Sequence, residues 1–468
     1  MTTFPPRHEV LFPDTEYREQ MEQALGALLR GVQLRSGAGS VMPNLAASRC
    51  AALPSFDAPA DLGAVLETVV TQMTEGQVQT THPGYFGLFN PAPTFPAELA
   101  DRIAASFNPQ ICVWTHAPFA VDVENHVIRE IAVRLGLPAD SGGHFTSGGS
   151  EANYTAALCA LTRHTPAYGD DGVFAFPGQP VIYVSRESHL AWLKIAHQLG
   201  IGRQAVRQLA TDGAGRMDAS ALRDAIEADT TAGAVPIMVA ATAGTTNAGV
   251  VDPLDACADI ARQYGLWFHV DAAWGGALVV SDTLRPVLDG IQRADSVTID
   301  AHKWFAATMG AGMFLTRDLG LLNQTFRVAT DYMPSNDAGA DLYVNSVQWS
   351  RRFVGLRLFL ALATAGWQGF AQHVERGVAL VDLLIERLAE DGWQCRNTSR
   401  MAVACLVPPA GSPAVTTIVS RVLASCSAWV SETRFEREPV LRVCVTNGYT
   451  GTEDVERLCS VLRSAIAT

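Results

Sequence analysis

The chain has 468 residues and a mass of 50.1 kDa, too long for one simple core, so two or three folding units are expected. Hydrophobic residues make up 48% and charged residues 17%, and no apolar stretch reaches the roughly 18 residues of a membrane helix. The formal net charge of -13 argues against nucleic-acid binding, which requires a basic surface. A small molecule is the expected partner.

The N-terminal residues and the cysteines bear on location and metal binding. The start lacks the basic end and apolar stretch of a signal peptide, which predicts a cytoplasmic location. The nine cysteines are scattered, without a Cys-x-x-Cys pair or a histidine cluster at zinc spacing. Reduced, buried thiols and no metal site are therefore expected.

The first 91 residues are predicted to form a helical arm. Residues 15–30 and 60–75 have helical patterns, and a loop with glycine, serine and proline at 36–43 separates them. These helices lack a core of their own. We expect them to pack on another domain or on a partner subunit.

Residues 92–370 are predicted to form a large α/β domain, because short β-branched runs alternate with helical stretches, as in a parallel sheet covered on both faces. Residues 371–468 are predicted to form a small α+β domain. The predicted strands of the large domain are 181–184, 235–241, 266–270 and 296–299. The predicted elements of the small domain are helices at 373–390, 412–425 and 454–467 and strands at 401–407 and 440–445.

Polar residues follow three of the predicted strands. The run 242–247 follows one strand, the next ends on Asp271, and the third is followed by Asp300, His302 and Lys303. Ligands of open parallel sheets bind at the carboxyl ends of the strands. Hydroxyls, carboxylates and one amine are thus expected at a single edge.

Lys303 is the first candidate for chemistry. A lone lysine after a strand is most often a solvated surface amine, but Lys303 lies between His302 and the apolar pair Trp304 and Phe305. Such surroundings solvate an ammonium poorly and favour a neutral or imine nitrogen. The context predicts a lysine that holds pyridoxal phosphate (PLP) as a Schiff base.

Asp271 is the second candidate for chemistry, as a carboxylate that could bind the same cofactor. Taken alone it could be a helix cap or a structural hydrogen-bond acceptor. Beside a PLP lysine, a carboxylate near the pyridine nitrogen keeps that nitrogen protonated and makes the ring an electron sink. The alanines that follow Asp271 would give the ring room.

The cofactor phosphate requires backbone donors at a helix N-terminus. Gly148 and Gly149 form a predicted turn, and Ser150 is the predicted N-cap of the helix that follows, although a plain turn is the alternative. His189 is either structural or a ring that stacks on the cofactor or moves a proton. His269, within a strand, is predicted to be a core residue.

These motifs together resemble the group II PLP-dependent amino-acid decarboxylases, which include aromatic-L-amino-acid, histidine and glutamate decarboxylases. The similarity extends from about Tyr17 to Leu462 and is densest at 82–96, 145–153, 241–253, 269–277, 296–305 and 348–370. It implies PLP-dependent transferase fold-type I, the aspartate-aminotransferase-like architecture. It also implies a homodimer with active sites at the subunit interface.

The resemblance carries over to individual residues. It implies that Lys303 is the Schiff-base lysine, that Asp271 is the partner of the pyridine nitrogen, and that His189 stacks over the ring. The remaining implied cofactor-binding residues are Gly148, Gly149, Ser150 and His302 at the phosphate and Thr246 and Ala273 along the cofactor. Asp300 stands where aromatic members often have asparagine, and this departure leaves a phosphate contact of its side chain open.

The polar, turn-rich segment 327–341 is predicted to be a mobile loop. In the family such a loop closes over the site, and Tyr332 resembles the tyrosine that returns a proton to the substrate α-carbon, which favours an amine product. Arg351 and Arg352 resemble the paired arginines of aromatic decarboxylases, one of which helps to hold the closed loop. A solvated basic face is the alternative.

The substrate pocket is predicted from residues 85–90 and 111–114, whose apolar character favours an aromatic side chain. The residues expected to line it are Phe86, Leu88, Phe89, Trp114 and Arg352. Leu88, Asn90 and Met309 depart from the aromatic members, so an acidic or aliphatic amino acid is an alternative substrate. An aldehyde synthase or carbon-carbon lyase of the same fold, or a non-catalytic binding protein, are alternative functions.

Overall fold

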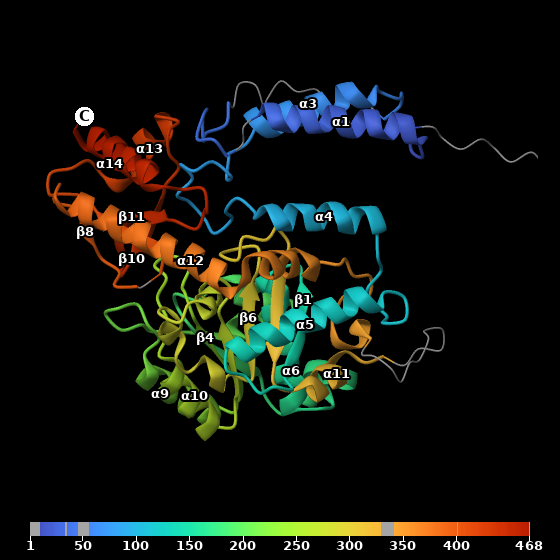
Figure 1. Cartoon of the computed structure of the whole chain (residues 1–468). Helices are drawn as coiled ribbons and strands as arrows, with labels where there is room; N and C mark the ends of the chain where they lie inside the picture. The colour runs from blue at the N-terminus through green and yellow to red at the C-terminus, as the bar shows by residue number, and fades with distance from the viewer. Residues whose placement is uncertain (1–9, 33–34, 45–55, 329–340, 400, 468) are drawn as a thin grey trace, which may run out of the picture.

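The computed structural model describes residues 10–32, 35–44, 56–328, 341–399 and 401–467. The chain forms an N-terminal helical arm, a large α/β domain and a small C-terminal domain (Figure 1). Tyr332 and most of the loop predicted at 327–341 lie outside the described residues. Within the described part of the chain, no helix combines the length and the apolar character needed to cross a membrane.

A seven-stranded sheet forms the centre of the large domain, with the spatial order β1-β7-β6-β5-β4-β2-β3. Strands β2 to β6 pair in parallel, while β7 runs antiparallel to both β1 and β6. The strands are β1 (Gly142–Thr146), β2 (Pro180–Ser185), β3 (Val206–Leu209), β4 (Val235–Thr242), β5 (Trp267–Asp271), β6 (Ser296–Asp300) and β7 (Gly312–Thr316). The four predicted strands are therefore confirmed, and β1, β3 and β7 were not predicted.

Helices cover both faces of this sheet because successive strand side chains point to opposite sides. On β2, Val181 and Tyr183 join the larger hydrophobic core, whereas Ile182 and Val184 join the second one. The larger core includes residues of α5 (Pro118–Arg134), α9 (Ala219–Thr231), α10 (Leu254–Gln263) and α12 (Gly355–Ala389). The second includes residues of α6 (Gly149–His164), α8 (Ala191–Gln198) and α11 (Leu319–Phe326).

The small domain is an antiparallel sheet, in the order β10-β11-β9-β8, with helices packed against it. Its elements are β8 (Gln394–Cys395), β9 (Val403–Val407), α13 (Val415–Ala424), β10 (Ser431–Phe435), β11 (Glu438–Cys444) and α14 (Thr452–Ala467). Helix α12 extends from the large domain into the small one across position 370, with a kink at Gly366, where φ is 63°. The predicted fold class, α/β of fold-type I with a small α+β domain, matches this arrangement.

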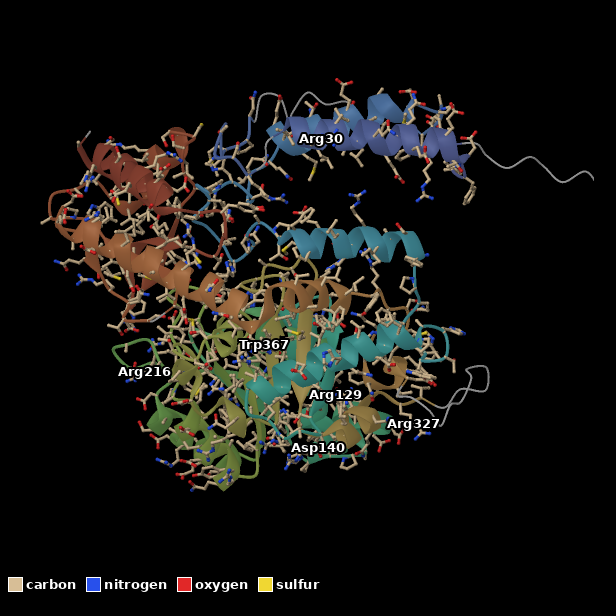
Figure 2. The ribbon with its side chains drawn as sticks, in the orientation of Figure 1. Arg30, Arg129, Asp140, Arg216, Arg327 and Trp367 are labelled. Carbon is tan, nitrogen blue, oxygen red and sulfur yellow. The ribbon has the colours of Figure 1, made fainter. Side chains whose placement is uncertain are left out.

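The arm consists of α1 (Thr15–Gly31) and α3 (Leu62–Glu75), which lie side by side away from the sheet (Figure 1). Asp14 and Asp61 cap these helices by accepting hydrogen bonds from the backbone N–H groups of Tyr17 and Ala64. Neither helix has a buried residue. Arg30 of α1 and Arg129 of α5 are among the charged side chains spread over the surface (Figure 2).

Helix α4 (Phe95–Phe107) links the arm to the large domain. It buries Ala97 and Ala100, and the carboxylate of Asp101 on this helix binds the buried Arg357 of α12 at 2.7 Å. The chain therefore enters the sheet domain through α4 and α5.

Candidate active site

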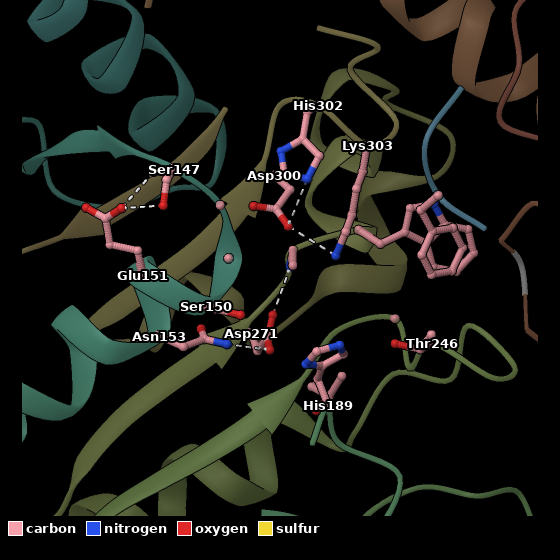
Figure 3. A pocket seen from close by; sticks show the side chains of 17 residues that line it. Ser147, Ser150, Glu151, Asn153, His189, Thr246, Asp271, Asp300, His302 and Lys303 are labelled. Carbon is pink, nitrogen blue, oxygen red and sulfur yellow. Dashed lines mark hydrogen bonds and ion pairs between the residues drawn. The ribbon is translucent and has the colours of Figure 1, made fainter. Parts of the chain in front are cut away.

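A cavity of about 310 Å³ lies at the edge of the large sheet where β1, β2, β4, β5 and β6 end. It gathers every described residue that the sequence predicts to be catalytic or cofactor-binding (Figure 3). These residues are Gly148, Gly149, Ser150, His189, Thr246, Asp271, Ala273, His302 and Lys303. Their individual roles stay predictions, and Tyr332 falls in the part of the chain that is not described.

Lys303 presents its amine to the cavity from the turn that follows β6. Its Nζ lies 3.1 Å from Oδ2 of Asp300, which is 3% exposed and whose Oδ1 has no hydrogen-bond partner among the described residues. His302 contacts the carbonyl oxygen of Ala311 through Nδ1 at 3.0 Å, which directs Nε2 toward Asp300 at 3.9 Å (Figure 3). Asp300 thus provides a buried counter-charge for the lysine.

Asp271 ends β5 and is held by neutral donors. Its Oδ2 accepts a hydrogen bond from Nδ2 of Asn153 at 2.8 Å, and its Oδ1 accepts one from the backbone N–H of Ala273 at 3.1 Å (Figure 3). No arginine or lysine among the described residues forms an ion pair with it. A buried carboxylate held in this way is suited to a positively charged ligand group.

The loop after β1 leads directly into α6, whose N-cap is Gly148. No side chain caps this helix, so the backbone N–H groups of its first turn can bind an anion. A Cβ at Gly149 would lie 2.9 Å from Oδ2 of Asp300 and 3.3 Å from Cβ of Ala273, so this close approach favours glycine. Ser150 was predicted to be the N-cap but lies in the first turn, because the Gly-Gly pair already enters the helix.

Two further side chains border the cavity from neighbouring strand ends. His189 follows β2, and its Nδ1 accepts a hydrogen bond from the backbone N–H of Ala191 at 3.1 Å, which leaves Nε2 as the protonated nitrogen of the neutral ring. Thr246 lies in the loop after β4. These positions agree with contacts to the faces of a planar ring.

Phe89 forms an aromatic wall of the cavity. Its ring stacks on Trp274 at a centroid distance of 4.1 Å, and Trp274 stacks on the buried Trp304 at 5.3 Å. The guanidinium group of Arg442 also packs on the Phe89 ring, 4.8 Å from its centroid. The Phe89 wall of the cavity therefore combines an aromatic surface with the positive charge of Arg442 packed against it.

The other residues predicted for the substrate pocket do not line the cavity within this chain. Phe86 is buried in the core, and Leu88 is 51% exposed. Trp114 donates from its indole to Asp122 at 3.0 Å, and Arg352 is exposed. Arg351, its neighbour, is instead buried in an ion pair with Glu124.

Asn153 and Arg442 are functional candidates to which the sequence analysis assigned no role. Asn153 lies on the buried face of α6 beside Ala152 and Ala156, and Arg442 interrupts the buried apolar run of β11. A polar side chain on an otherwise apolar buried face requires a partner, and this signal could have identified both.

The chain's own residues fit PLP in three places. An uncapped helix N-terminus suits the phosphate, a half-buried lysine suits the aldehyde, and a carboxylate without a cationic partner suits the ring nitrogen. The fold and this cavity together define the class of fold-type I PLP enzymes.

Comparisons with known proteins also indicate a PLP enzyme. Residues 53–398 match the family model described as the pyridoxal-dependent decarboxylase conserved domain, so the chain belongs to this family. The chain is 35% identical to cysteine sulfinic acid decarboxylase of Mus musculus over 342 residues, 71% of this chain and 69% of that protein. It is 28% identical to aromatic-L-amino-acid decarboxylase of Bacillus atrophaeus over 397 residues, 82% and 81% of the two chains.

A solved structure shows the same architecture. The crystal structure of mouse CSAD in its apo form superposes with a TM-score of 0.90 at 27% identity, covering 97% of this chain and 99% of that one. The chain is thus an enzyme, a PLP-dependent carboxy-lyase, as the sequence analysis predicted. The predicted preference for an aromatic substrate is not confirmed.

We predict that Lys303→Ala lowers turnover by a factor on the order of a thousand or more, because the covalent attachment point is lost. Borohydride reduction followed by intact-mass measurement should fix PLP to the wild-type chain but not to the variant. Lys194→Ala, which removes an exposed lysine of α8, is the control and should keep both properties. Wild-type turnover in Lys303→Ala would contradict the assignment.

Proposed function

We propose that this enzyme decarboxylates an L-amino acid with an acidic side chain, releasing carbon dioxide and the corresponding amine. The observation that carries the substrate class is Arg442, which is 2% exposed and forms no ion pair with any described carboxylate. Its Nη2 is buried without a hydrogen-bond partner in the described part of the chain. A buried, unpaired cation beside the cavity favours an anionic ligand.

The position of Arg442 is fixed by two backbone carbonyl groups. Its Nε donates to the carbonyl oxygen of Thr246 at 3.0 Å and its Nη1 to that of Gly87 at 2.8 Å. The guanidinium group therefore cannot swing away from Phe89 without losing both bonds. The similarity to cysteine sulfinic acid decarboxylase supports the same substrate class.

The roles of the cavity residues follow from their chemistry. When bound, PLP supplies an electron-withdrawing ring for the electron pair left behind as carbon dioxide departs. Lys303 binds the aldehyde carbon, and Asp271 keeps the ring nitrogen protonated. The N–H groups of Gly149 and Ser150, together with His302, bind the phosphate. His189 stacks on the ring and restricts its tilt.

An aromatic amino acid is the second candidate substrate. The stack of Phe89, Trp274 and Trp304 offers a flat apolar surface next to Lys303, whose Nζ lies 5.9 Å from the Phe89 centroid. The similarity to the aromatic-L-amino-acid decarboxylase of Bacillus atrophaeus supports this alternative.

A panel of substrates separates the two candidates. We expect carbon dioxide release from cysteine sulfinate, aspartate or glutamate with a higher kcat/KM than from phenylalanine, tyrosine, tryptophan or 3,4-dihydroxyphenylalanine. The measurement is coupled detection of carbon dioxide with identification of the amine, and Lys303→Ala serves as the blank. Higher kcat/KM values across the aromatic set would overturn the acidic assignment.

Tyr332 is proposed to return the proton to the substrate α-carbon, as its resemblance to the family tyrosine implies. We predict that Tyr332→Phe shifts the product from amine toward aldehyde, because the carbanion then persists long enough to react with oxygen. Amine, aldehyde and hydrogen peroxide are quantified from the same reaction. Unchanged amine yield, with no peroxide, would rule out the protonation role and leave the decarboxylase assignment intact.

A homodimer is also proposed, because the arm and α4 expose apolar side chains that the chain itself does not cover. Leu29, Val69 and Met73 of the arm are 48%, 51% and 54% exposed, and Phe107 of α4 is 83% exposed. Leu29, Val69 and Met73 line one groove of the arm and Phe107 lines another on α4, and exposed apolar grooves are typical of a protein interface.

We therefore expect light scattering during size exclusion to give twice the 50.1 kDa mass of one chain. Replacing Val69 and Met73 with glutamate should shift the mass toward that of the monomer, since charges would be placed in the interface. Replacing the surface residue Arg129 with glutamate is the control. A monomer at micromolar concentration in the wild type would contradict the proposal.

A further inference from the structure

A continuous row of hydrogen bonds extends from Asp271 into the core of the large domain. Asn153 of α6 donates to Asp271, and its Oδ1 contacts Nε2 of His269 on β5 at 3.0 Å. Nδ1 of His269 contacts Oγ of Ser296 on β6 at 2.8 Å. Oγ of Ser296 accepts from the indole N–H of Trp267 at 2.9 Å. The row thus connects the active-site carboxylate to four buried side chains behind it.

The direction of each bond in this row follows from its carboxylate end. The carboxylate of Asp271 can only accept, so Asn153 turns Nδ2 toward it and Oδ1, which also only accepts, toward His269. Nε2 of His269 must then carry the ring proton and donate it to Asn153. Nδ1 of the neutral ring accepts, so the Ser296 hydroxyl donates to it while accepting from the indole of Trp267. The hydroxyl of Thr298 lies 3.4 Å from the same Nε2 and is compatible with this tautomer as a second, weaker acceptor.

His269 is neutral in this arrangement. It is 0% exposed, and burial lowers its pKa to about 4, although the charge of Asp271 acts in the opposite direction. The groups that face its ring are neutral: Asn153, Ser296, Thr298 and the edge of Trp192 at a centroid distance of 5.8 Å. The row therefore delivers aligned dipoles to Asp271 but no positive charge.

This arrangement has a consequence for the ligand. Asp271 is fixed in position by two N–H donors, and no cation among the described residues forms an ion pair with its carboxylate. A protonated ring nitrogen supplies the missing positive charge. A cation in place of His269 would compete for that interaction.

We propose that Asn153 and His269 are positioning residues, which hold the carboxylate of Asp271 in the orientation that keeps the ring nitrogen of PLP protonated. The inference depends on the role proposed for Asp271 in the decarboxylation. It assigns His269 the Nε2–H tautomer and makes Asn153 the link between that ring and the carboxylate.

The tautomer is testable on the unmodified holoenzyme by ¹⁵N NMR of histidine-labelled protein. We expect one imidazole with Nε2 protonated and Nδ1 unprotonated, unchanged between pH 6 and 8. Its assignment comes from the signal missing in His269→Gln, a variant that keeps a donor and an acceptor. A His269 ring that carries its proton on Nδ1, or on both nitrogens, would overturn the proposal without any variant at Asn153.

The link to the cofactor is tested with Asn153→Ala, using PLP labelled with ¹⁵N in its ring. We expect PLP to bind roughly 10- to 100-fold more weakly, the effect of losing one hydrogen bond to a charged group. The ring nitrogen should also shift toward its unprotonated resonance. Asn447→Ala is the control, because Asn447 is a buried amide of the small domain with three hydrogen bonds away from the cavity. It should leave the nitrogen resonance unchanged.

Asp271→Ala, measured in parallel, separates the two levels of the argument. If the ring nitrogen stays protonated in Asp271→Ala, the role proposed for Asp271 fails. If it is unprotonated in Asp271→Ala but as in the wild type in Asn153→Ala, only the positioning role of Asn153 is wrong. Circular dichroism and thermal unfolding establish whether each variant is folded. If a variant does not fold, the proposal is tested by the tautomer of His269 in the wild-type holoenzyme.

Discussion

The site depends on the shared direction of the strands, which brings the carboxyl ends of β1, β2, β4, β5 and β6 to one edge of the sheet. Strand β7 lies between β1 and β6 and runs antiparallel to both, so β1 has the same direction as β6. The loop at Gly148 and Gly149 therefore reaches the edge where β5 and β6 end. Residues separated by more than one hundred positions in the chain meet there for this reason alone.

The two aspartates that line the cavity lie in different electrostatic situations. Asp300 lies 3.1 Å from the amine of Lys303, so its charge has a partner within the protein. Asp271 accepts hydrogen bonds only from an amide side chain and a backbone N–H. The difference explains how one carboxylate can balance the lysine while the other is kept for a cation of the ligand. Two carboxylates of identical surroundings would not divide these tasks.

The small domain supports one wall of the cavity, because its Arg442 packs against Phe89. Arg442 comes from β11, and its hydrogen bonds reach the loop after β4 and the segment before α4. Phe89 is consequently held between the stacked ring of Trp274 and a guanidinium group. Any shift of the small domain relative to the sheet would move this charge, so the packing of α12 and β11 sets the position of a candidate substrate-binding group.

The sequence by itself determined the strands β2, β4, β5 and β6 and the candidates Lys303 and Asp271, because buried parallel strands are short apolar runs with polar residues directly after them. Strands β1 and β7 were not predicted, because each begins with glycine, which interrupts the apolar pattern of a strand. Only the tertiary structure paired Asn153 with Asp271, 118 positions away, and Arg442 with Thr246, 196 positions away. It also separated Phe89, in the cavity, from Phe86, in the core, since apolar character alone does not indicate which surface a side chain contacts.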